Sequence, residues 1–204
     1  MRLILVRHGE SVGNFENRLQ GQADYDLTEL GRRQAALTAD RLHALGTTAV
    51  YSSHLLRAHA TAKAIGARLG TGCSVLEDVS EYHFGEMSGA TYAEVRERFG
   101  TIASPAERIY PGEEGRDVFF RRVTEALWGV AEAHPGETVA VVSHGGPIAL
   151  FCQAVLGLPY KRPMPFSISN CSLNVIEIEP GQGNAARTTR LIRLNDVCHL
   201  NSLV

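Results

Sequence analysis

The sequence predicts an α/β fold with three layers, in which helices cover both faces of a mostly parallel central sheet. Two observations lead to this expectation. Short apolar runs, such as residues 3–6 and 138–143, alternate with longer segments whose apolar residues recur at helical spacing. Strands that alternate with helices in this way are typical of a sheet covered on both faces. The chain contains no internal repeat and no low-complexity segment.

The elements expected in the first half of the chain have clear end signals. A strand at residues 3–6 precedes a helix that begins after Thr28, a good N-cap, and ends before Gly46. Its core stripe consists of the apolar residues Ala35, Ala39, Leu42 and Leu45. The elements that follow are a second strand at 49–52, a helix at 54–69 stopped by Gly70, and a short third strand at 73–76.

The second half begins with an irregular region, residues 81–115, in which one helix is expected at 91–99. We interpret its main part, about 82–115, as a lid-like insertion over the sheet edge within a single domain of residues 1–204. The remaining elements are a helix at 117–134 with Phe119, Val123, Leu127 and Val130 on one face, a buried strand at 138–143, a helix at 147–156, and strands at 171–179 and 188–195 joined by a turn at 181–184.

Composition narrows the functional classes. The chain has 204 residues, a hydrophobic fraction of 44% and a net charge of −2, with no polybasic block that would favour nucleic acid or a membrane surface. Its apolar runs are too short for a membrane span, and the first strand leaves no room for a signal peptide, so we expect a cytoplasmic protein. No cysteine pair has zinc-ligand spacing, and we expect buried free thiols at Cys73, Cys152, Cys171 and Cys198.

Charged side chains follow four of the predicted strands. Arg7 and His8 come after the first, Arg57 after the second, Glu81 after the third and His144 after the fourth. Because open α/β sheets bind ligands at the carboxyl ends of their strands, these groups should share one pocket. Two arginines and two histidines favour a phosphoryl group, whose oxygens match guanidinium donors. A carboxyl group beside a bound phosphate tends to keep its proton, which suits Glu81 as a general acid.

The chain resembles the histidine phosphatase superfamily, also called the phosphoglycerate mutase-like family. A lone Arg-His-Gly would be weak evidence, but an ordered set of motifs that each follow the right predicted element is specific. The resemblance covers nearly the whole chain and implies the fold of that family. Its motifs are Arg7-His8-Gly9-Glu10-Ser11 with Asn14; Gln20-Gly21 with Asp26-Leu27-Thr28; Ser52-Ser53 through Arg57-Ala58 to Thr61-Ala62; Glu81 with Gly85 and Gly89; and Val142-Ser143-His144-Gly145-Gly146.

The resemblance implies a role for each of these residues. His8 attacks phosphorus and becomes phosphohistidine, while Glu81 protonates the leaving alcohol and then serves as base for water. The side chains that surround the phosphoryl oxygens are Arg7, Arg57 and His144, helped by Asn14 and the amide of Gly145, and those that line the entrance are Gln20 and Gly21.

No cofactor or metal is expected. The sequence has no carboxylate cluster with metal-ligand spacing and no nucleotide-binding glycine loop. Arg7, Arg57 and a protonated His144 can supply the positive charge that many phosphotransferases take from magnesium. For His8 to attack, its reactive nitrogen must be unprotonated, and its other nitrogen should donate to an acceptor that the sequence does not identify.

Within the family, hydrolysis and mutase chemistry both begin with phosphohistidine. Family mutases usually carry a longer, arginine-rich insertion after the residue equivalent to Glu81, and Tyr82 stands where they place an arginine. No paired arginines occur between Glu81 and Arg116. We therefore predict a phosphatase acting on small phosphate monoesters, with a cofactor-dependent phosphoglycerate mutase as the alternative. A non-catalytic phosphate-binding protein would require the loss of a core residue, and none is missing.

The expected ligands are a small phosphorylated metabolite and phosphate. Sugar phosphates, phosphoserine, phosphoglycerate derivatives and a ribazole phosphate remain open, and Arg96, Arg98 or Arg108 could meet a substrate carboxylate. Glu114 ends a Pro-Gly-Glu-Glu segment where the family often has Gly-Gly-Glu-Ser. An exposed edge strand could pair two copies into a homodimer. A substrate with an apolar body is suggested by the lid residues Tyr82, Phe84, Met87, Tyr92, Ile109 and Tyr110.

Overall fold

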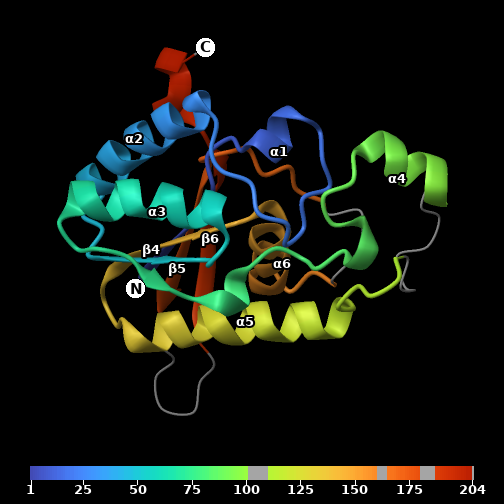
Figure 1. Ribbon diagram of the computed structural model, residues 1–204. Helices are drawn as coiled ribbons and strands as arrows, with labels where there is room; N and C mark the ends of the chain where they lie inside the picture. Colours follow the sequence, from blue (N-terminus) through green and yellow to red (C-terminus); the bar gives the residue numbers. More distant parts are fainter. Residues whose placement is uncertain (101–109, 160–164, 180–186, 204) are drawn as a thin grey trace.

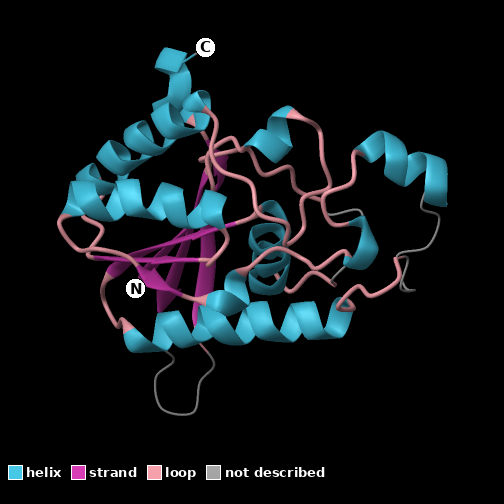
Figure 2. Ribbon diagram, viewed as in Figure 1, coloured by secondary structure: helices cyan, strands magenta, loops and turns pink. Residues whose placement is uncertain are grey.

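The computed structural model describes residues 1–100, 110–159, 165–179 and 187–203. Its centre is a six-stranded sheet in the order β3-β2-β4-β1-β5-β6, with helices on both sides (Figures 1 and 2). The strands are β1 (Arg2–Arg7), β2 (Ala49–Ser52), β3 (Ser74–Val75), β4 (Thr138–Ser143), β5 (Leu173–Glu179) and β6 (Thr188–Asp196).

The sheet is mostly parallel. Strands β3, β2, β4 and β1 run in one direction, β5 is antiparallel to β1, and β6 is antiparallel to β5. The predicted three-layer α/β class is therefore confirmed. The strand order comes from the structure alone, because the sequence pattern does not reveal which strands are neighbours.

Helices α2 and α3 cover one face of the sheet, and α5 and α6 cover the other (Figure 1). In β1, Leu3 and Leu5 pack in the α5/α6 cluster, whereas Ile4 and Val6 pack in the α2/α3 cluster, as the alternation of a strand requires. The helices and single 3-10 turns are α1 (Val12–Phe15), α2 (Glu29–Ala44), α3 (Leu56–Leu69), η1 (Glu77–Val79), η2 (Gly85–Met87), α4 (Tyr92–Phe99), α5 (Arg116–Ala133), α6 (Gly145–Val155) and η3 (Cys198–Leu203).

Local signals in the sequence account for the ends of the long helices. The Thr28 hydroxyl caps α2 by accepting from the Gly31 amide at 3.0 Å. Gly70 ends α3 with φ near 71°, a left-handed conformation that costs glycine little. The four residues expected on the apolar face of α5 are all buried. These elements confirm the prediction.

Several boundaries differ from the prediction. The helix α3 begins at Leu56 rather than residue 54, and α6 begins at Gly145 rather than residue 147, so the two glycines expected in a turn form its first turn. The third strand contains only Ser74–Val75, and β5 begins at Leu173. The periodicity also misses α1, because one helical turn is too short to repeat an apolar pattern. The turn expected at 181–184 lies outside the described residues.

The connections after β1 and β4 leave toward opposite faces of the sheet. These neighbouring parallel strands pair Arg7 with Ser143 at their carboxyl ends. The chain then continues from β1 toward α2 on one face and from β4 into α6 on the other (Figure 1). Open α/β sheets bind ligands where neighbouring strands send their helices to opposite faces.

The aromatic residues of the predicted lid pack on one another rather than lining a substrate pocket. Met87, Val95 and Tyr110 form a small core with Phe84 and Phe99. Tyr82 is buried in the main core, and Tyr92 is 53% exposed. The inference of an apolar substrate was therefore wrong for the buried residues, which stabilise this segment. Ile109 lies outside the described residues, and the lid-like insertion in a single domain stays a prediction.

All four cysteines are free thiols, but only two are buried. Burial raises the pKa of Cys152 and of Cys171 to about 12. Cys73 is half-buried and Cys198 is exposed, so the expectation of four buried thiols was wrong. Among the described residues, none of the helices is both long enough and apolar enough to span a membrane.

We predict that Gly31→Ala lowers the free energy of unfolding by about 1–3 kcal/mol, because a Cβ at this position would collide with the main-chain carbonyl of Glu10. Urea denaturation measures the change. The control is Gly129→Ala in α5, where a Cβ meets nothing within 4 Å. Alanine there should raise stability by about 0.5–1 kcal/mol through helix propensity. Equal stability of the two variants would contradict the proposed close contact.

Candidate active site

Two buried histidines meet at the carboxyl ends of β1 and β4. The His8 and His144 rings lie 5.2 Å apart between centroids, and their residues are 2% and 0% exposed. The main chain fixes their relative position, since the His8 amide donates to the carbonyl of Ser143 at 3.0 Å. The pairing of β1 with β4 therefore brings together two residues that are far apart in the sequence, as predicted.

The ring of His8 is held in one tautomer. Its Nδ1 lies 2.7 Å from the carbonyl oxygen of Gly9, which can only accept, so Nδ1 carries the proton and Nε2 carries the lone pair. Burial lowers the pKa of His8 well below its usual value, and the nearby Arg57 and Arg7 lower it further. The ring is therefore neutral at physiological pH, with Nε2 able to act as a nucleophile. Gly9 is the acceptor that the sequence did not identify.

A threonine connects the His8 loop to α3. The Gly9 amide donates to the Thr61 hydroxyl at 3.0 Å, and that hydroxyl donates to the carbonyl of Arg57 at 2.8 Å. Thr61 occurs in the motif that follows Arg57, but its function as a link was not predicted. The helix that carries Arg57 thus also holds the main chain that orients His8.

Arg57 is a buried cation held by carbonyl groups. It is 1% exposed, and its Nη2 and Nη1 donate to the carbonyls of Gly21 at 2.6 Å and Ala23 at 2.9 Å. Gly21 has φ near 52°, and a Cβ there would approach the Tyr82 carbonyl to 3.1 Å. Burial lowers the pKa of Arg57 to about 10, opposed chiefly by Glu81, so the group stays charged at neutral pH.

Three buried nitrogen atoms at this site have no hydrogen-bond partner in the described part of the chain: Arg7 Nε, Arg57 Nε and His144 Nδ1. The Arg7 Nη1 donates to the Ile168 carbonyl at 2.6 Å, and neither arginine forms an ion pair with a described carboxylate. A buried donor without a partner costs about 1–3 kcal/mol. Several such atoms in one place, beside two guanidinium groups, are characteristic of a binding site for an anion.

His144 is oriented by a serine that precedes α3. Its Nε2 lies 2.9 Å from the Ser53 hydroxyl, which also accepts from the Leu55 amide at 3.2 Å. Burial lowers the pKa of His144 well below its usual value, with Arg57 and His8 lowering it further. The protonated His144 expected from the sequence is therefore not the resting state of the protein. A bound phosphoryl dianion would favour its protonation.

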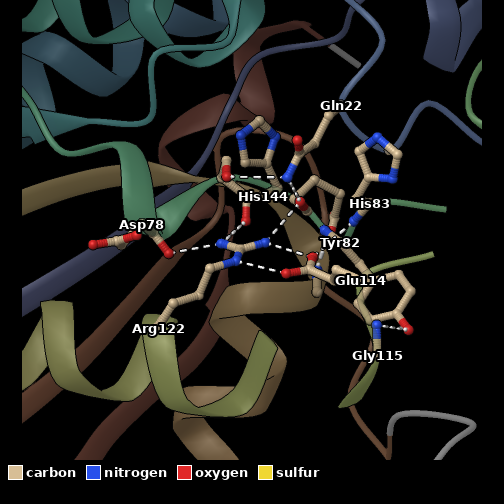
Figure 3. A network of polar contacts seen from close by, with 12 residues as sticks. Gln22, Asp78, Tyr82, His83, Glu114, Gly115, Arg122 and His144 are labelled. Carbon is tan, nitrogen blue, oxygen red and sulfur yellow. Dashed lines mark hydrogen bonds and ion pairs between the residues drawn. The ribbon is translucent and has the colours of Figure 1, made fainter. Parts of the chain in front are cut away.

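Glu81 reaches the site from the loop after η1. Its carboxylate accepts from the Tyr82 amide at 2.9 Å and from the Gly146 amide at 3.1 Å. A Cβ at Gly146 would collide with the Glu81 carboxyl and displace it from this position. The main chain of this loop is held by Gln22 and Arg122 (Figure 3). The carboxyl of Glu81 therefore has a defined position beside the first turn of α6.

The amide oxygen of Asn14 is held by hydrogen bonds from neighbouring residues. Its Oδ1 accepts from the Ser11 amide at 3.2 Å and from Asn170 Nδ2 at 3.1 Å. Because an amide N–H can only donate, these contacts fix which end of the Asn14 amide is oxygen. Asn170 also donates to the His8 carbonyl at 2.9 Å, and no sequence signal singled it out.

The remaining predicted residues take different positions. Gln20 is 8% exposed, accepts from the Ser11 hydroxyl at 2.7 Å and packs against Gly13, so it supports the loop rather than facing solvent. Gly21 orients Arg57 through its carbonyl. Gly145 is the first residue of α6, where main-chain amides and the helix dipole favour an anion. An entrance position for Gln20 and Gly21 stays a prediction.

Comparison with known proteins is consistent with this geometry. The family model described as "Histidine phosphatase superfamily (branch 1)" matches residues 3–190. The chain belongs to the histidine phosphatase superfamily. It is 34% identical to phosphoserine phosphatase 1 of Hydrogenobacter thermophilus, covering 98% of this chain and 94% of the relative. It is 35% identical to phosphoglycerate mutase-like protein 4 of Arabidopsis thaliana, covering 88% of this chain and 80% of the relative.

The fold is also shared with solved structures. A mycobacterial glucosyl-3-phosphoglycerate phosphatase in complex with VO3 superposes with a TM-score of 0.85 at 29% identity, covering 95% of this chain and 98% of that chain. The predicted fold and family are thus confirmed. The described residues contain no group of three or more histidine, cysteine, aspartate or glutamate side chains that could hold a metal ion.

We predict that the protein loses stability as the pH falls below 6.5 in phosphate-free buffer. The folded-state pKa values of His8 and His144 lie below the usual 6.5. The unfolded chain therefore binds protons that the folded chain does not, and stability present above 6.5 is lost as the pH falls toward the folded values. Each histidine can contribute up to about 1.4 kcal/mol per pH unit. Urea denaturation at several pH values between about 7 and 5 measures how the free energy of unfolding changes with pH.

A matched pair of variants assigns this slope. His144→Gln should reduce the pH dependence of stability by the contribution of one histidine. His43→Gln replaces an exposed histidine and should leave the pH dependence unchanged. An unaltered slope in His144→Gln would contradict the argument that this buried ring is neutral in the folded protein.

Proposed function

We propose that this member of the superfamily is a metal-independent phosphatase that hydrolyses small phosphate monoesters through a phosphohistidine at His8. The observation that carries the proposal is the set of unpartnered buried nitrogen atoms of Arg7, Arg57 and His144 around a histidine whose Nε2 lone pair is available. A phosphoryl group supplies the acceptors and the negative charge that this pocket lacks. The cytoplasmic location and the homodimer expected from the sequence stay predictions.

In the first step, His8 Nε2 attacks phosphorus in line with the ester oxygen. The N–P bond forms as the P–O bond to the alcohol breaks, and Glu81 transfers its proton to the leaving oxygen. The Gly9 carbonyl keeps the proton on Nδ1, so the lone pair that attacks is on Nε2. The products of this step are the free alcohol and a phosphohistidine, with Glu81 as carboxylate.

In the second step, water replaces the alcohol. The Glu81 carboxylate accepts a proton from water as the new P–O bond forms and the N–P bond breaks. Inorganic phosphate is released, and both His8 and Glu81 return to their initial states. The same carboxyl thus serves as acid and then as base, as microscopic reversibility allows.

Positive charge from side chains takes the place of a metal ion in this proposal. The transferring phosphoryl group develops charge on its equatorial oxygens, which cationic donors stabilise. Arg7 and Arg57 remain charged after burial, and binding of the dianion would favour protonation of His144. Asn14 and the amide of Gly145 are further donors for the same oxygens. Each of these contacts strengthens in the transition state.

Phosphatase chemistry is favoured over mutase chemistry by the residues after Glu81. Tyr82 is 1% exposed, packs against Phe119 and accepts from the Gly115 amide through its hydroxyl, so this position provides no cation for a second phosphate. Arg98 pairs with Glu86 on the surface at 3.4 Å. Arg96 is exposed on the same short helix, and Arg108 lies outside the described residues. The mutase-like relative keeps isomerisation as the second candidate.

We predict that purified protein releases phosphate from small monoesters and that His8→Ala lowers the turnover by several powers of ten, because removal of a nucleophile eliminates the covalent path. The assay incubates a panel of phosphomonoesters and measures released phosphate. A parallel reaction with 3-phosphoglycerate and 2,3-bisphosphoglycerate measures 2-phosphoglycerate.

The two readouts separate the candidates. Phosphate release without isomerisation supports the phosphatase, and the preferred ester identifies the substrate class. Rapid isomerisation with little phosphate release would overturn the proposal in favour of a mutase. The exposed His54→Ala variant controls for loss of a histidine near the strand ends. Turnover unaffected by His8→Ala would exclude the phosphohistidine mechanism.

We predict that chelators leave the rate unchanged. EDTA removes divalent metals, and the charge on the transferring phosphoryl group is stabilised here by side chains. Initial rates with EDTA and with added Mg²⁺ should agree within the error of the assay. Strict dependence on Mg²⁺ would show that the cationic side chains do not supply the charge that the reaction needs.

A further inference from the structure

One arginine of α5 divides its hydrogen-bond donors between the loop that carries Glu81 and the side chain of Glu114. Its Nη1 donates to the carbonyls of Asp78 at 2.7 Å and Ser80 at 2.8 Å, and its Nη2 donates to the carbonyl of Glu81 at 3.0 Å. The other donors pair with Glu114, from Nη2 to Oε1 at 2.7 Å and from Nε to Oε2 at 2.8 Å. Figure 3 shows this arginine, Arg122, at the centre of the network.

Glu114 binds both Arg122 and this loop, and we refer to Arg122 and Glu114 together as the clamp. Besides pairing with Arg122, its Oε1 accepts from the His83 amide at 2.8 Å. The side chains of Arg122 and Glu114 are only 15% and 13% exposed, so solvent screens this pair weakly. The guanidinium also lies 5.0 Å from the centre of the Phe119 ring. This geometry accounts for the second glutamate of the segment in which the family often has Gly-Gly-Glu-Ser.

The contacts hold the main chain on both sides of Glu81. Carbonyls of residues before Glu81 and of Glu81 itself bind Arg122, and the amide two residues later binds Glu114. Gln22 adds a second donor to the Glu81 carbonyl at 3.0 Å. The main chain at Glu81 is therefore fixed, and the position of the carboxyl depends further only on the side-chain torsion angles of Glu81.

We propose that Arg122 and Glu114 are positioning residues that hold the Glu81 carboxyl in reach of the leaving oxygen. This inference rests on the proposed function of Glu81. Neither residue touches the phosphoryl group. General acid catalysis contributes about 10²–10⁴-fold to a rate, and a misplacement of about 1 Å can cost about 100-fold. A lysine at position 122 would keep the charge but have three donors in place of five and no planar fork.

The test compares two leaving groups. In an alkyl phosphate such as phosphoserine, the alkoxide needs a proton as the bond breaks, whereas p-nitrophenolate leaves readily without one. The quantity measured is kcat/KM, which covers the steps up to formation of phosphohistidine and excludes its hydrolysis. We expect Arg122→Lys to lose about 10–100-fold with phosphoserine and less than about 3-fold with p-nitrophenyl phosphate.

The chain provides a matched control for this change. Arg121 precedes Arg122 in α5 and is exposed, so Arg121→Lys makes the same substitution outside the network and should leave both values unchanged. Glu114→Gln removes the charge but keeps the size of the side chain, and we expect the same leaving-group difference. Its result also decides the question if Arg122→Lys does not fold.

Glu81→Gln provides the reference for the loss of the acid. It should show the leaving-group difference more strongly than either clamp variant. If Glu81→Gln shows the difference but Arg122→Lys and Glu114→Gln lose equally with both esters, the positioning role is overturned and the function of Glu81 stands. If Glu81→Gln loses equally with both esters, its role as acid fails and the inference fails with it. The His8→Ala variant in the same assay tests the phosphohistidine separately. If it has no activity, the phosphohistidine mechanism stands whichever of these results is obtained.

Discussion

Positive charge buried around His8 is the constraint on which the rest of the structure depends. Two guanidinium groups and two imidazoles are buried together at the carboxyl ends of β1 and β4, and such groups are costly to bury without partners. No carboxylate in the described part of the chain forms an ion pair with either arginine. The protein binds them with main-chain carbonyls of Gly21, Ala23 and Ile168, which satisfy donors without removing the charge. The pocket therefore keeps a positive potential that a phosphoryl group can neutralise.

The same charge decides the protonation of the two histidines. Burial and the two nearby arginines lower the pKa of His8 and so keep the ring neutral, while the Gly9 carbonyl holds the proton on Nδ1 and leaves the lone pair on Nε2. Burial and the same positive charges also lower the pKa of His144. The ring is therefore neutral in the free protein, whereas a protonated ring was expected from the sequence. The order of events follows from electrostatics: the substrate itself would generate part of the charge that stabilises its transition state.

Main-chain contacts give this pocket its precision. The loop of His8 lies against α2 at Gly31 and against α3 through Thr61, and the loop of Glu81 lies against α6 at Gly146. These contacts leave no room for a Cβ at Gly31 or Gly146. Close approach of the main chain explains Gly9 and Gly31, whereas a Cβ at Gly146 would meet the Glu81 carboxyl. The position of the candidate site thus depends on contacts with helices from both layers.

The sequence by itself determined the fold class, most helix ends and which side chains gather at the candidate site, because these depend on periodicity, capping and ordered local motifs. Only the tertiary structure decided the strand order, the Gly9 acceptor, the neutral state of His144 and the clamp on Glu81. It also showed that the lid aromatics Phe84 and Tyr110 pack on each other. The Gly9 acceptor is next to His8 in the chain, but the loop conformation that presents it is held by Thr61 of α3. The other features are contacts between segments far apart in the chain, or sums of charges over such contacts, and a local pattern does not encode either. Arg122 illustrates the reason, since its sequence neighbours give no sign that a loop 41 residues earlier receives its donors.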